Sequence, residues 1–278
     1  MKGAKMDTKI LEVVIKAVKE AGAFAVSHQV GIEAVPKRDK SPVTKVDLAV
    51  SKMIQKAIKP YTDLPNHALI DEESEEDKAT PWKLFSEREF AWFIDPISGT
   101  LSYLNGLPFF GISVGLLRNG KPYLGVVSIP ALKELYWYIN GKAYCQIGDS
   151  PVCQLKKNKV QMTPFSLFYV HIHQHFSLSE KISRTISFPA VQPGFIWSGT
   201  GRLTGALIDE IIKVWDFAGA WGICQACGLD FYTLKTGKKM EAITSTYFNK
   251  QWQMKMPMIL TKKDNLGVLR KNIKVIAK

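Results

Sequence analysis

The sequence predicts a layered fold of the α/β or α+β class, with helices on both faces of mixed sheets. Near its start, the chain shows the apolar periodicity of an amphipathic helix, and residues 109–139 then alternate apolar and polar side chains. The second half mixes short apolar runs, typical of strands, with longer helical patterns. For 278 residues we expect two closely packed halves, 1–155 and 156–278, with the second completing the site of the first.

The first part of the chain is predicted to hold two helices separated by loops. Residues 6–28 place apolar side chains at helical spacing, so we expect an amphipathic helix there. The polar stretch 36–46 is predicted to be a loop. A second helix is predicted to begin near Asp47, whose carboxylate can help to start it. Residues 74–89 are charged and lack periodicity, which indicates another loop.

A sheet is predicted to follow. The continuous apolar run at 90–94 indicates a short buried strand that ends at Asp95. Residues 109–139 indicate an antiparallel meander, because turn residues separate their apolar runs. The last of these runs ends at Asn140-Gly141, the dipeptide most typical of a tight hairpin.

The second half is predicted to alternate short strands and helices. The expected elements are a strand at 165–172, helices at 204–212 and 218–227, strands at 229–232 and 258–260, and a helix from about Asp264. Cys224 and Cys227 form a CxxC pair within the second of these helices. Because no second such pair or flanking Cys/His pair exists, we expect a buried structural role for both.

The amino-acid composition limits the classes of protein to which this chain can belong. The net charge is +12, from 37 basic and 25 acidic residues, but the lysines are dispersed and no RNA-binding signature accompanies them. A solvated basic surface is therefore favoured over nucleic acid as a partner, and its field suits a phosphorylated substrate. No apolar run reaches about 18 residues, the N-terminus lacks a signal peptide, and four cysteines are too few for a disulfide scaffold. We therefore expect a cytoplasmic protein without a membrane span.

Four short segments place acidic residues where apolar runs end or helices begin. They are Asp47, Asp71-Glu72-Glu73-Ser74, Asp95-Pro96-Ile97-Ser98-Gly99-Thr100, and Trp215-Asp216-Phe217-Ala218-Gly219-Ala220. Taken singly, each is typical of a solvated turn or a helix cap. Taken together, they offer the carboxylate and carbonyl oxygens that a hard divalent cation such as Mg²⁺ prefers.

In their order along the chain, these segments resemble the motifs of the inositol monophosphatase family of Mg²⁺-dependent, Li⁺-sensitive phosphatases. The family motif DPIDGT appears here as DPISGT, the Glu-Glu pair as Glu72-Glu73, and WDxAGA as 215–220. The element K-x₃₋₆-T-x₂-D is matched from Lys40 to Asp47. The resemblance covers residues 6 to about 270. It implies a layered αβαβα sandwich, hydrolysis of a small phosphomonoester such as inositol monophosphate, and a homodimer.

The resemblance also implies a set of metal ligands. Glu72, Asp95 and the carbonyl of Ile97 would hold the principal Mg²⁺. Asp95 and Asp216 would hold a second cation, and the family's sites hold two or three. Such ions polarise the phosphoryl oxygens and stabilise the leaving group in an in-line displacement.

The same resemblance assigns the water and the phosphate. Thr100 and Asp47 would orient and deprotonate the attacking water, and Glu73 would assist from the outer shell. The amides of Gly99 and Thr100, next to Ser98, would cradle the phosphate, because oriented N–H groups favour an anion.

The sequence departs from the family pattern at Ser98, where the family has Asp. A serine hydroxyl is neutral, so the site has one negative charge fewer to balance the cations than it would have with Asp. We therefore expect a weakened second metal site and weak or absent activity at ordinary Mg²⁺ concentrations. Histidinol phosphate, a 3′,5′-bisphosphorylated nucleotide and a sugar bisphosphate are alternative substrates. A non-catalytic family member that binds a protein or nucleic acid is the alternative from another class.

Two further features bear on the substrate. Asp209 lies seven residues before Asp216, where inositol phosphatases carry an acidic residue that contacts substrate hydroxyls. Asp209 or the adjacent Glu210 would make this contact, and a surface position on a helix is the alternative. His171, His173 and His175 would share one face of a strand. We weigh three interpretations for them: an exposed strand or turn, contact with substrate, and a transition-metal site.

Overall fold

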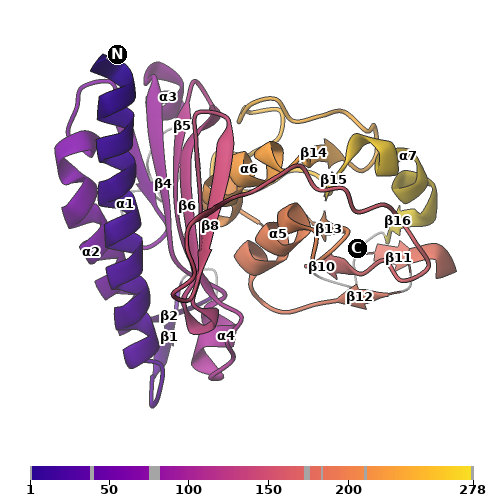
Figure 1. The fold of residues 1–278 in the computed structure, drawn as a ribbon, viewed down its shortest axis with the longest axis horizontal. Helices are drawn as coiled ribbons and strands as arrows, with labels where there is room; N and C mark the ends of the chain where they lie inside the picture. Colours follow the sequence, from indigo (N-terminus) through magenta and orange to yellow (C-terminus); the bar gives the residue numbers. More distant parts are fainter. Residues whose placement is uncertain are drawn as a thin grey trace.

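The chain forms five layers in the order helix, sheet, helix, sheet, helix (Figure 1). This arrangement confirms the predicted layered αβαβα sandwich. The computed structural model describes residues 2–37, 41–74, 82–171, 176–182, 184–209 and 212–276.

Helices α1 (Lys2–Ser27) and α2 (Lys45–Thr62) form the first layer and cover one face of the larger sheet. The predicted first helix is confirmed. The second begins two residues before Asp47, because Thr44 is the N-cap and Asp47 is the third helical residue, the two joined in a capping box. The predicted loop before it is wrong in part, since β1 (Ala34–Pro36) and β2 (Pro42–Thr44) pair as an antiparallel ribbon.

The larger sheet has seven strands in chain order, with β3 and β4 parallel and the rest antiparallel. Its strands are β3 (His67–Asp71), β4 (Phe90–Ser98), β5 (Gly111–Arg118), β6 (Lys121–Ile129), β7 (Glu134–Ile139), β8 (Lys142–Ile147) and β9 (Cys153–Gln154). The predicted meander is confirmed. At its Asn140-Gly141 turn both residues have positive φ, as a tight hairpin requires.

Two predictions near this sheet are wrong at their boundaries. The strand expected to stop at Asp95 continues to Ser98, because it keeps pairing with β5. The charged stretch predicted as a loop contains helix α3 (Trp82–Glu87), which packs apolar side chains into the core. Short turns of helix follow other strands: α4 (Thr100–Leu104), η1 (Pro130–Leu132) and η3 (Glu180–Ile182).

Helices α5 (Val191–Thr200) and α6 (Trp215–Ala226) form the middle layer between the two sheets. The predicted helix at 218–227 is confirmed as part of α6, and Cys224 and Cys227 are buried, as expected. Glycine permits the close contact between α6 and the sheet: a Cβ on Gly125 would lie 2.2 Å from the carbonyl oxygen of Gly219. This contact seats the start of α6, and with it Asp216, against β5 and β6.

The smaller sheet has the order β12-β10-β13-β15-β14. Its strands are β10 (Phe168–Val170), β12 (Thr185–Ile186), β13 (Gly205–Ile208), β14 (Asp230–Thr233) and β15 (Met258–Thr261). The helix predicted at 204–212 is wrong, since β13 is a fully buried strand paired on both sides. A short apolar run buried on both faces has no amphipathic signature, so periodicity alone does not distinguish it from a helix.

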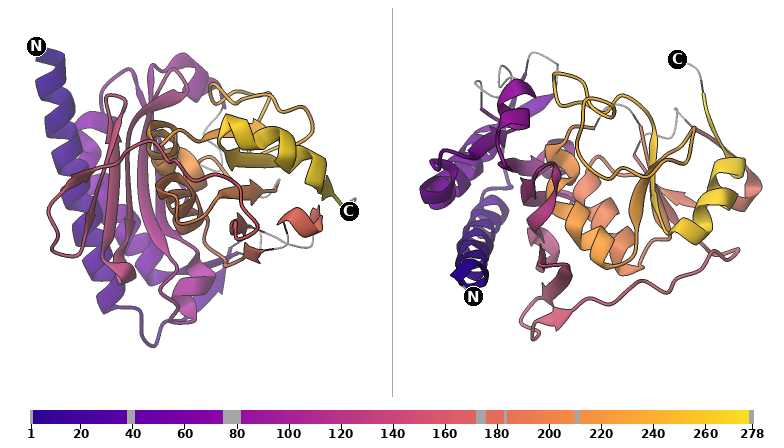
Figure 2. Two further views of the ribbon diagram at one scale, coloured as in Figure 1. Left: turned by 45° about the vertical axis from the view of Figure 1, so that its right-hand side comes forward. Right: turned by 90° about the horizontal axis from the view of Figure 1, so that it is seen from above.

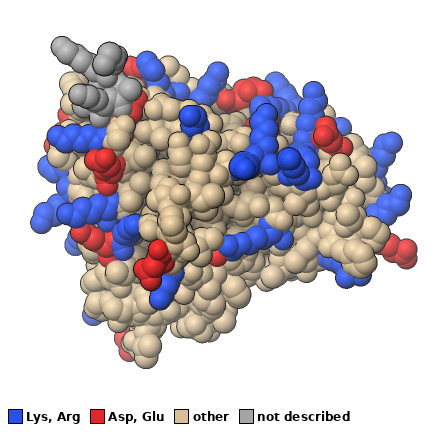
Figure 3. Space-filling view, in the orientation of Figure 1, with Lys and Arg blue, Asp and Glu red and all other residues tan. Residues whose placement is uncertain are grey.

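The outer layer consists of α7 (Lys263–Asn272) together with the ribbon of β11 (Phe176–Leu178) and β16 (Ile273–Val275). Figure 2 shows α1 and α7 at opposite sides of the molecule. Among the described residues, no helix combines the length and apolar character needed to cross a membrane. On the face drawn in Figure 3, Lys and Arg side chains are spread over both halves and interleaved with acidic ones.

Candidate active site

Asp95 lies at a bulge near the end of β4. The pairing register with β5 shifts between Asp95 and Ser98, where β4 holds one residue more than its partner. Pro96 sits in this bulge, where its missing N–H costs no ladder bond. Bulges re-aim side chains, and this one sits within the DPISGT motif.

The Asp95 carboxylate is fully buried, and neither of its oxygens has a hydrogen-bond partner among the described residues. Burial raises its pKa well above the ordinary value, and the nearby charges of Glu72 and Asp216 raise it further. Lys37 and the hydroxyl of Ser98 oppose this rise, although that hydroxyl makes no well-formed hydrogen bond. A buried carboxylate with two unpaired oxygens is stable only when a proton or a cation neutralises it.

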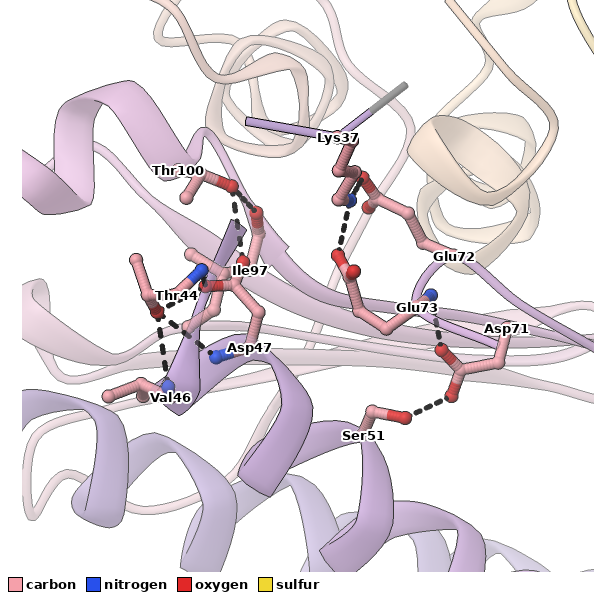
Figure 4. A network of polar contacts seen from close by, with 10 residues as sticks. All are labelled: Lys37, Thr44, Val46, Asp47, Ser51, Asp71, Glu72, Glu73, Ile97 and Thr100. Atoms are coloured by element: carbon pink, nitrogen blue, oxygen red, sulfur yellow. Dashed lines mark hydrogen bonds and ion pairs between the residues drawn. The ribbon is translucent and has the colours of Figure 1, made fainter. Parts of the chain in front are cut away.

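Lys37 binds the acidic pair that follows β3. Its Nζ lies 2.8 Å from Glu72 Oε1 and 2.5 Å from Glu73 Oε1 (Figure 4). Burial lowers the pKa of Lys37, but the two carboxylates outweigh this effect and raise it above its usual range. Burial and the charge of Glu72 raise the pKa of Glu73 to about 8, against the opposing effect of Lys37.

Sequence reasoning missed Lys37. The motif was matched from Lys40, which lies outside the described residues. Lys37, by contrast, directly follows β1, and its amide closes the β1–β2 ribbon on the carbonyl of Ser41. Neither its residue type nor its place in the run PKRDK distinguishes Lys37 in the sequence, so its contact with Glu72 and Glu73 is known from the tertiary structure.

Asp47 and Thr100 meet, as predicted. Thr100 Oγ1 lies 3.2 Å from Asp47 Oδ1 and 3.2 Å from the carbonyl oxygen of Ile97, so its proton is shared between two acceptors. The other oxygen of Asp47 accepts hydrogen bonds from the amide and hydroxyl of Thr44. Burial raises the pKa of Asp47, whereas these bonds from Thr44 lower it.

Gly99 stands between Ser98 and helix α4 in the left-handed conformation, with φ of 89°. A Cβ at this position would lie 2.4 Å from the Cβ of Ala190 and 2.6 Å from the carbonyl oxygen of Pro189. The predicted phosphate-binding segment is therefore pressed against the start of α5, which belongs to the second half of the chain.

The second half contributes two acidic residues. Asp216, in the first turn of α6, accepts a hydrogen bond of 2.6 Å from the amide of Lys213. Burial and the charge of Glu72 raise its pKa to about 7. Asp209 directly follows β13 rather than lying on a surface helix, so that alternative is wrong. Its carboxylate, 2% exposed, lies 3.2 Å from His171 Nδ1. Glu210, His173 and His175 lie outside the described residues.

These residues have the chemistry of a Mg²⁺ site. The ionised Asp95 carboxylate needs a positive charge to neutralise it, and Glu72 and Asp216 are the acidic residues whose charges raise its pKa most. In the described part of the chain, no three His, Cys or acidic side chains are already gathered closely enough to hold a metal ion. Glu72 is instead engaged by the ammonium of Lys37. The donors are hard oxygens, which suit Mg²⁺.

Comparison with known proteins identifies the family. The profile of the inositol monophosphatase family matches residues 5–263. The chain belongs to this family. Its members are phosphatases that hydrolyse phosphoric monoesters, which confirms the resemblance seen in the motifs.

Three curated relatives illustrate the family's range. The chain is 32% identical to a fructose-1,6-bisphosphatase/inositol-1-monophosphatase of Thermotoga maritima, over 85% of this chain and 89% of the relative. It is 25% identical to a histidinol-phosphatase of Chlorobaculum parvum, over 80% and 84%. A similarly described bifunctional enzyme of Aquifex aeolicus is 35% identical, but the match spans only 38% of this chain and 39% of that protein.

Solved structures support the fold. An IMPase/NADP phosphatase complexed with Mg²⁺ and phosphate superimposes with a TM-score of 0.76 at 20% identity, covering 96% of this chain and 95% of that one. The inositol monophosphatase of Thermotoga maritima gives a TM-score of 0.73 at 21% identity, covering 94% and 95%. At this level of identity the comparison establishes the fold alone.

Proposed function

We propose that this member of the family hydrolyses a small phosphomonoester, with inositol monophosphate as the first candidate, and that it requires Mg²⁺. The observation that carries the proposal is Asp95: a fully buried carboxylate, neither of whose oxygens has a hydrogen-bond partner among the residues that the structure describes, close to the charges of Glu72 and Asp216. The ionised form of such a carboxylate is costly without a cation and favourable with one.

In this proposal, Glu72, Asp95 and the Ile97 carbonyl hold the principal ion, and Asp95 and Asp216 hold a second, within a set of two or three. Bound Mg²⁺ supplies positive charge against the phosphoryl oxygens and the attacking water. Glu72 lies 2.8 Å from the ammonium of Lys37, so its carboxylate would balance the charge of the ion as well as that of Lys37.

The water is positioned by Asp47 and Thr100. Thr100 Oγ1 donates its proton toward Asp47 Oδ1 or the Ile97 carbonyl, which leaves its lone pairs to accept a hydrogen bond from water. The proton of the attacking water passes to Asp47 through Thr100, and Glu73 assists from the outer shell. The bonds from Thr44 oppose the rise that burial causes in the pKa of Asp47, and they hold its carboxylate in place.

The phosphate rests on the amides of Gly99 and Thr100, next to the Ser98 hydroxyl. The remainder of the substrate extends toward the second half of the chain, where Asp209 contacts its hydroxyl groups. Because Asp209 is 2% exposed and contacts His171, we propose that His171 moves with it when substrate binds.

Ser98 weakens the second metal site in this proposal, because a neutral hydroxyl, 3% exposed and unpaired, stands where a carboxylate would add charge. The deciding experiment measures phosphate release from inositol monophosphate across Mg²⁺ concentrations, for the natural chain and for Ser98→Asp. We expect Ser98→Asp to be more active at low Mg²⁺, by about tenfold for each 1.4 kcal/mol of added metal affinity. Equal activity of the two proteins at all Mg²⁺ concentrations would refute the missing-ligand account.

The substrate and the cell biology belong to the same proposal. A panel of inositol monophosphate, histidinol phosphate, a sugar bisphosphate and a 3′,5′-bisphosphorylated nucleotide, each with and without Li⁺, ranks the candidates; relatives carry the names histidinol-phosphatase and 3′(2′),5′-bisphosphate nucleotidase. We propose a cytoplasmic homodimer inhibited by Li⁺. The halves 1–155 and 156–278 remain a prediction.

Ser98 and the net charge of +12 favour one other function, a non-catalytic member that binds an anionic partner. Salt-dependent RNA binding without phosphate release, even in Ser98→Asp, would support that function instead.

A further inference from the structure

Asp71 precedes the acidic pair and closes the turn that carries it. It is the last residue of β3 and is fully buried. Its Oδ1 accepts a hydrogen bond of 2.9 Å from the amide of Glu73, and its carbonyl accepts one of 3.2 Å from the amide of Ser74. The amide of Glu72 meanwhile donates to the carbonyl of Ile94, next to Asp95. The orientation of both glutamates therefore depends on this turn.

The same carboxylate also reaches helix α2. Its Oδ2 accepts hydrogen bonds from Ser51 Oγ, at 2.8 Å, and from Gln55 Nε2, at 2.9 Å. These two donors also bond each other, at 3.1 Å. Asp47, Ser51 and Gln55 are spaced four residues apart, so they share one face of α2. Figure 4 shows Ser51 reaching Asp71 from the helix whose first turn carries Asp47.

We propose that Asp71 is a positioning residue for the metal site: its buried carboxylate fixes the turn bearing Glu72 and Glu73 against the helix bearing Asp47. This inference rests on the proposed function and deepens it, because it names what holds two of the site's elements in register. A carboxylate is suited to this position because it has two oxygens: one accepts from the Glu73 amide while the other accepts from Ser51 and Gln55.

Burial determines how strongly the link acts. Asp71 and Ser51 are 0% and 4% exposed, so water does not replace a lost partner without entering the core. Groups that orient metal ligands from behind change metal affinity by about 10- to 100-fold when they are removed. Loss of the link is therefore expected to lower metal affinity by an amount in that range, and not only to lower stability.

The test titrates Mn²⁺, as a probe metal, into the full-length chain by calorimetry and records thermal unfolding of the same samples. Asp71→Ala is expected to weaken Mn²⁺ binding about 10-fold or more. Asp71→Asn, which keeps an oxygen for the Glu73 amide, is expected to lose less. If Asp71→Ala does not fold, Asp71→Asn and Ser51→Ala carry the test, and each must weaken binding.

The matched control is Glu134→Gln. Glu134 is a comparably buried acid, 5% exposed, that accepts hydrogen bonds from Tyr136, Trp197 and Arg202 at the other side of the sheet. Its substitution is expected to lower the melting temperature and leave Mn²⁺ affinity unchanged. Glu72→Gln, which removes a proposed ligand, reports whether the titrated ion occupies this site.

Two outcomes separate this inference from the proposed function. If Glu72→Gln weakens binding while Asp71→Ala, Asp71→Asn and Ser51→Ala all retain the natural affinity, Asp71 is merely structural and the inference is overturned. If Glu72→Gln binds Mn²⁺ as the natural chain does, the proposed metal centre itself is refuted, and the role of Asp71 falls with it.

Discussion

Substitution of Gly99 by alanine measures how tightly the phosphate-binding segment is held against the second half of the chain. The new Cβ would lie 2.4 Å from that of Ala190 and 2.6 Å from the carbonyl of Pro189, and the backbone is left-handed, with φ of 89°. The left-handed conformation costs a non-glycine residue about 1–2 kcal/mol. Overpacking of a rigid contact adds about 1–3 kcal/mol. We therefore expect Gly99→Ala to lower the free energy of unfolding by about 2–5 kcal/mol in total.

The control isolates the contact from the backbone strain. Gly141, in the turn between β7 and β8, has a similar φ of 75°, but a Cβ there would meet no atom of the described residues within 4 Å. Gly141→Ala is expected to cost only the strain, about 1–2 kcal/mol. Chemical denaturation of both variants gives the difference. Ala190→Gly should relieve part of the clash, so Gly99→Ala in that background is expected to cost about 1 kcal/mol less. A Gly99→Ala variant no less stable than Gly141→Ala would contradict the close approach of α4 and α5.

Two further predictions concern the charges of the site. Lys37→Met removes a buried ammonium from Glu72 and Glu73. Without added metal it is expected to lower the free energy of unfolding by about 3–5 kcal/mol, and Mg²⁺ is expected to restore part of the loss. Lys59→Met, which breaks an exposed ion pair, should cost under about 1 kcal/mol in the same denaturation assay. The folded-state pKa values of Asp216 (about 7) and Glu73 (about 8) exceed their ordinary 3.8 and 4.5, so the metal-free folded state binds more protons than the unfolded state between these values. The contribution of these two carboxyl groups to stability is thus present at low pH and lost as the pH rises through about 8. Mg²⁺ affinity is expected to rise over the same interval, because binding releases the protons. Calorimetry at about pH 6 and 8 checks the sign, and tighter Mg²⁺ binding at the lower pH would contradict it.

The parts of the fold that were predicted correctly rest on local signals. The periodicity of α1 and the turn at Asn140-Gly141 each depend on the conformational preferences of a few neighbouring residues. The acidic motifs were also visible, because their residue types and order along the chain suffice to indicate oxygen ligands and the family. Pairing of Asp47 with Thr100 follows from the resemblance, and the distance of 3.2 Å agrees with it.

Other features depended on contacts between distant segments. Residues 205–208 form a strand because β10 and β15 offer backbone partners on both sides, which no property of the segment itself reveals. Asp47 lies inside helix α2, as its third residue, because Thr44 is the N-cap. Lys37 contacts Glu72 across 35 positions of the chain, a long-range ion pair that no property of its own segment reveals.

The sequence by itself therefore determined the family, the layered framework and the acidic residues that we propose carry the chemistry. Only the tertiary structure decided how they are supported: Asp95 has no hydrogen-bond partner in the described part of the chain, Glu72 is held by Lys37, and Asp71 joins the acidic turn to α2. The physical reason is that a side chain's type is a local property. Its burial, its partners and the proton it carries depend on segments brought together from both ends of the chain.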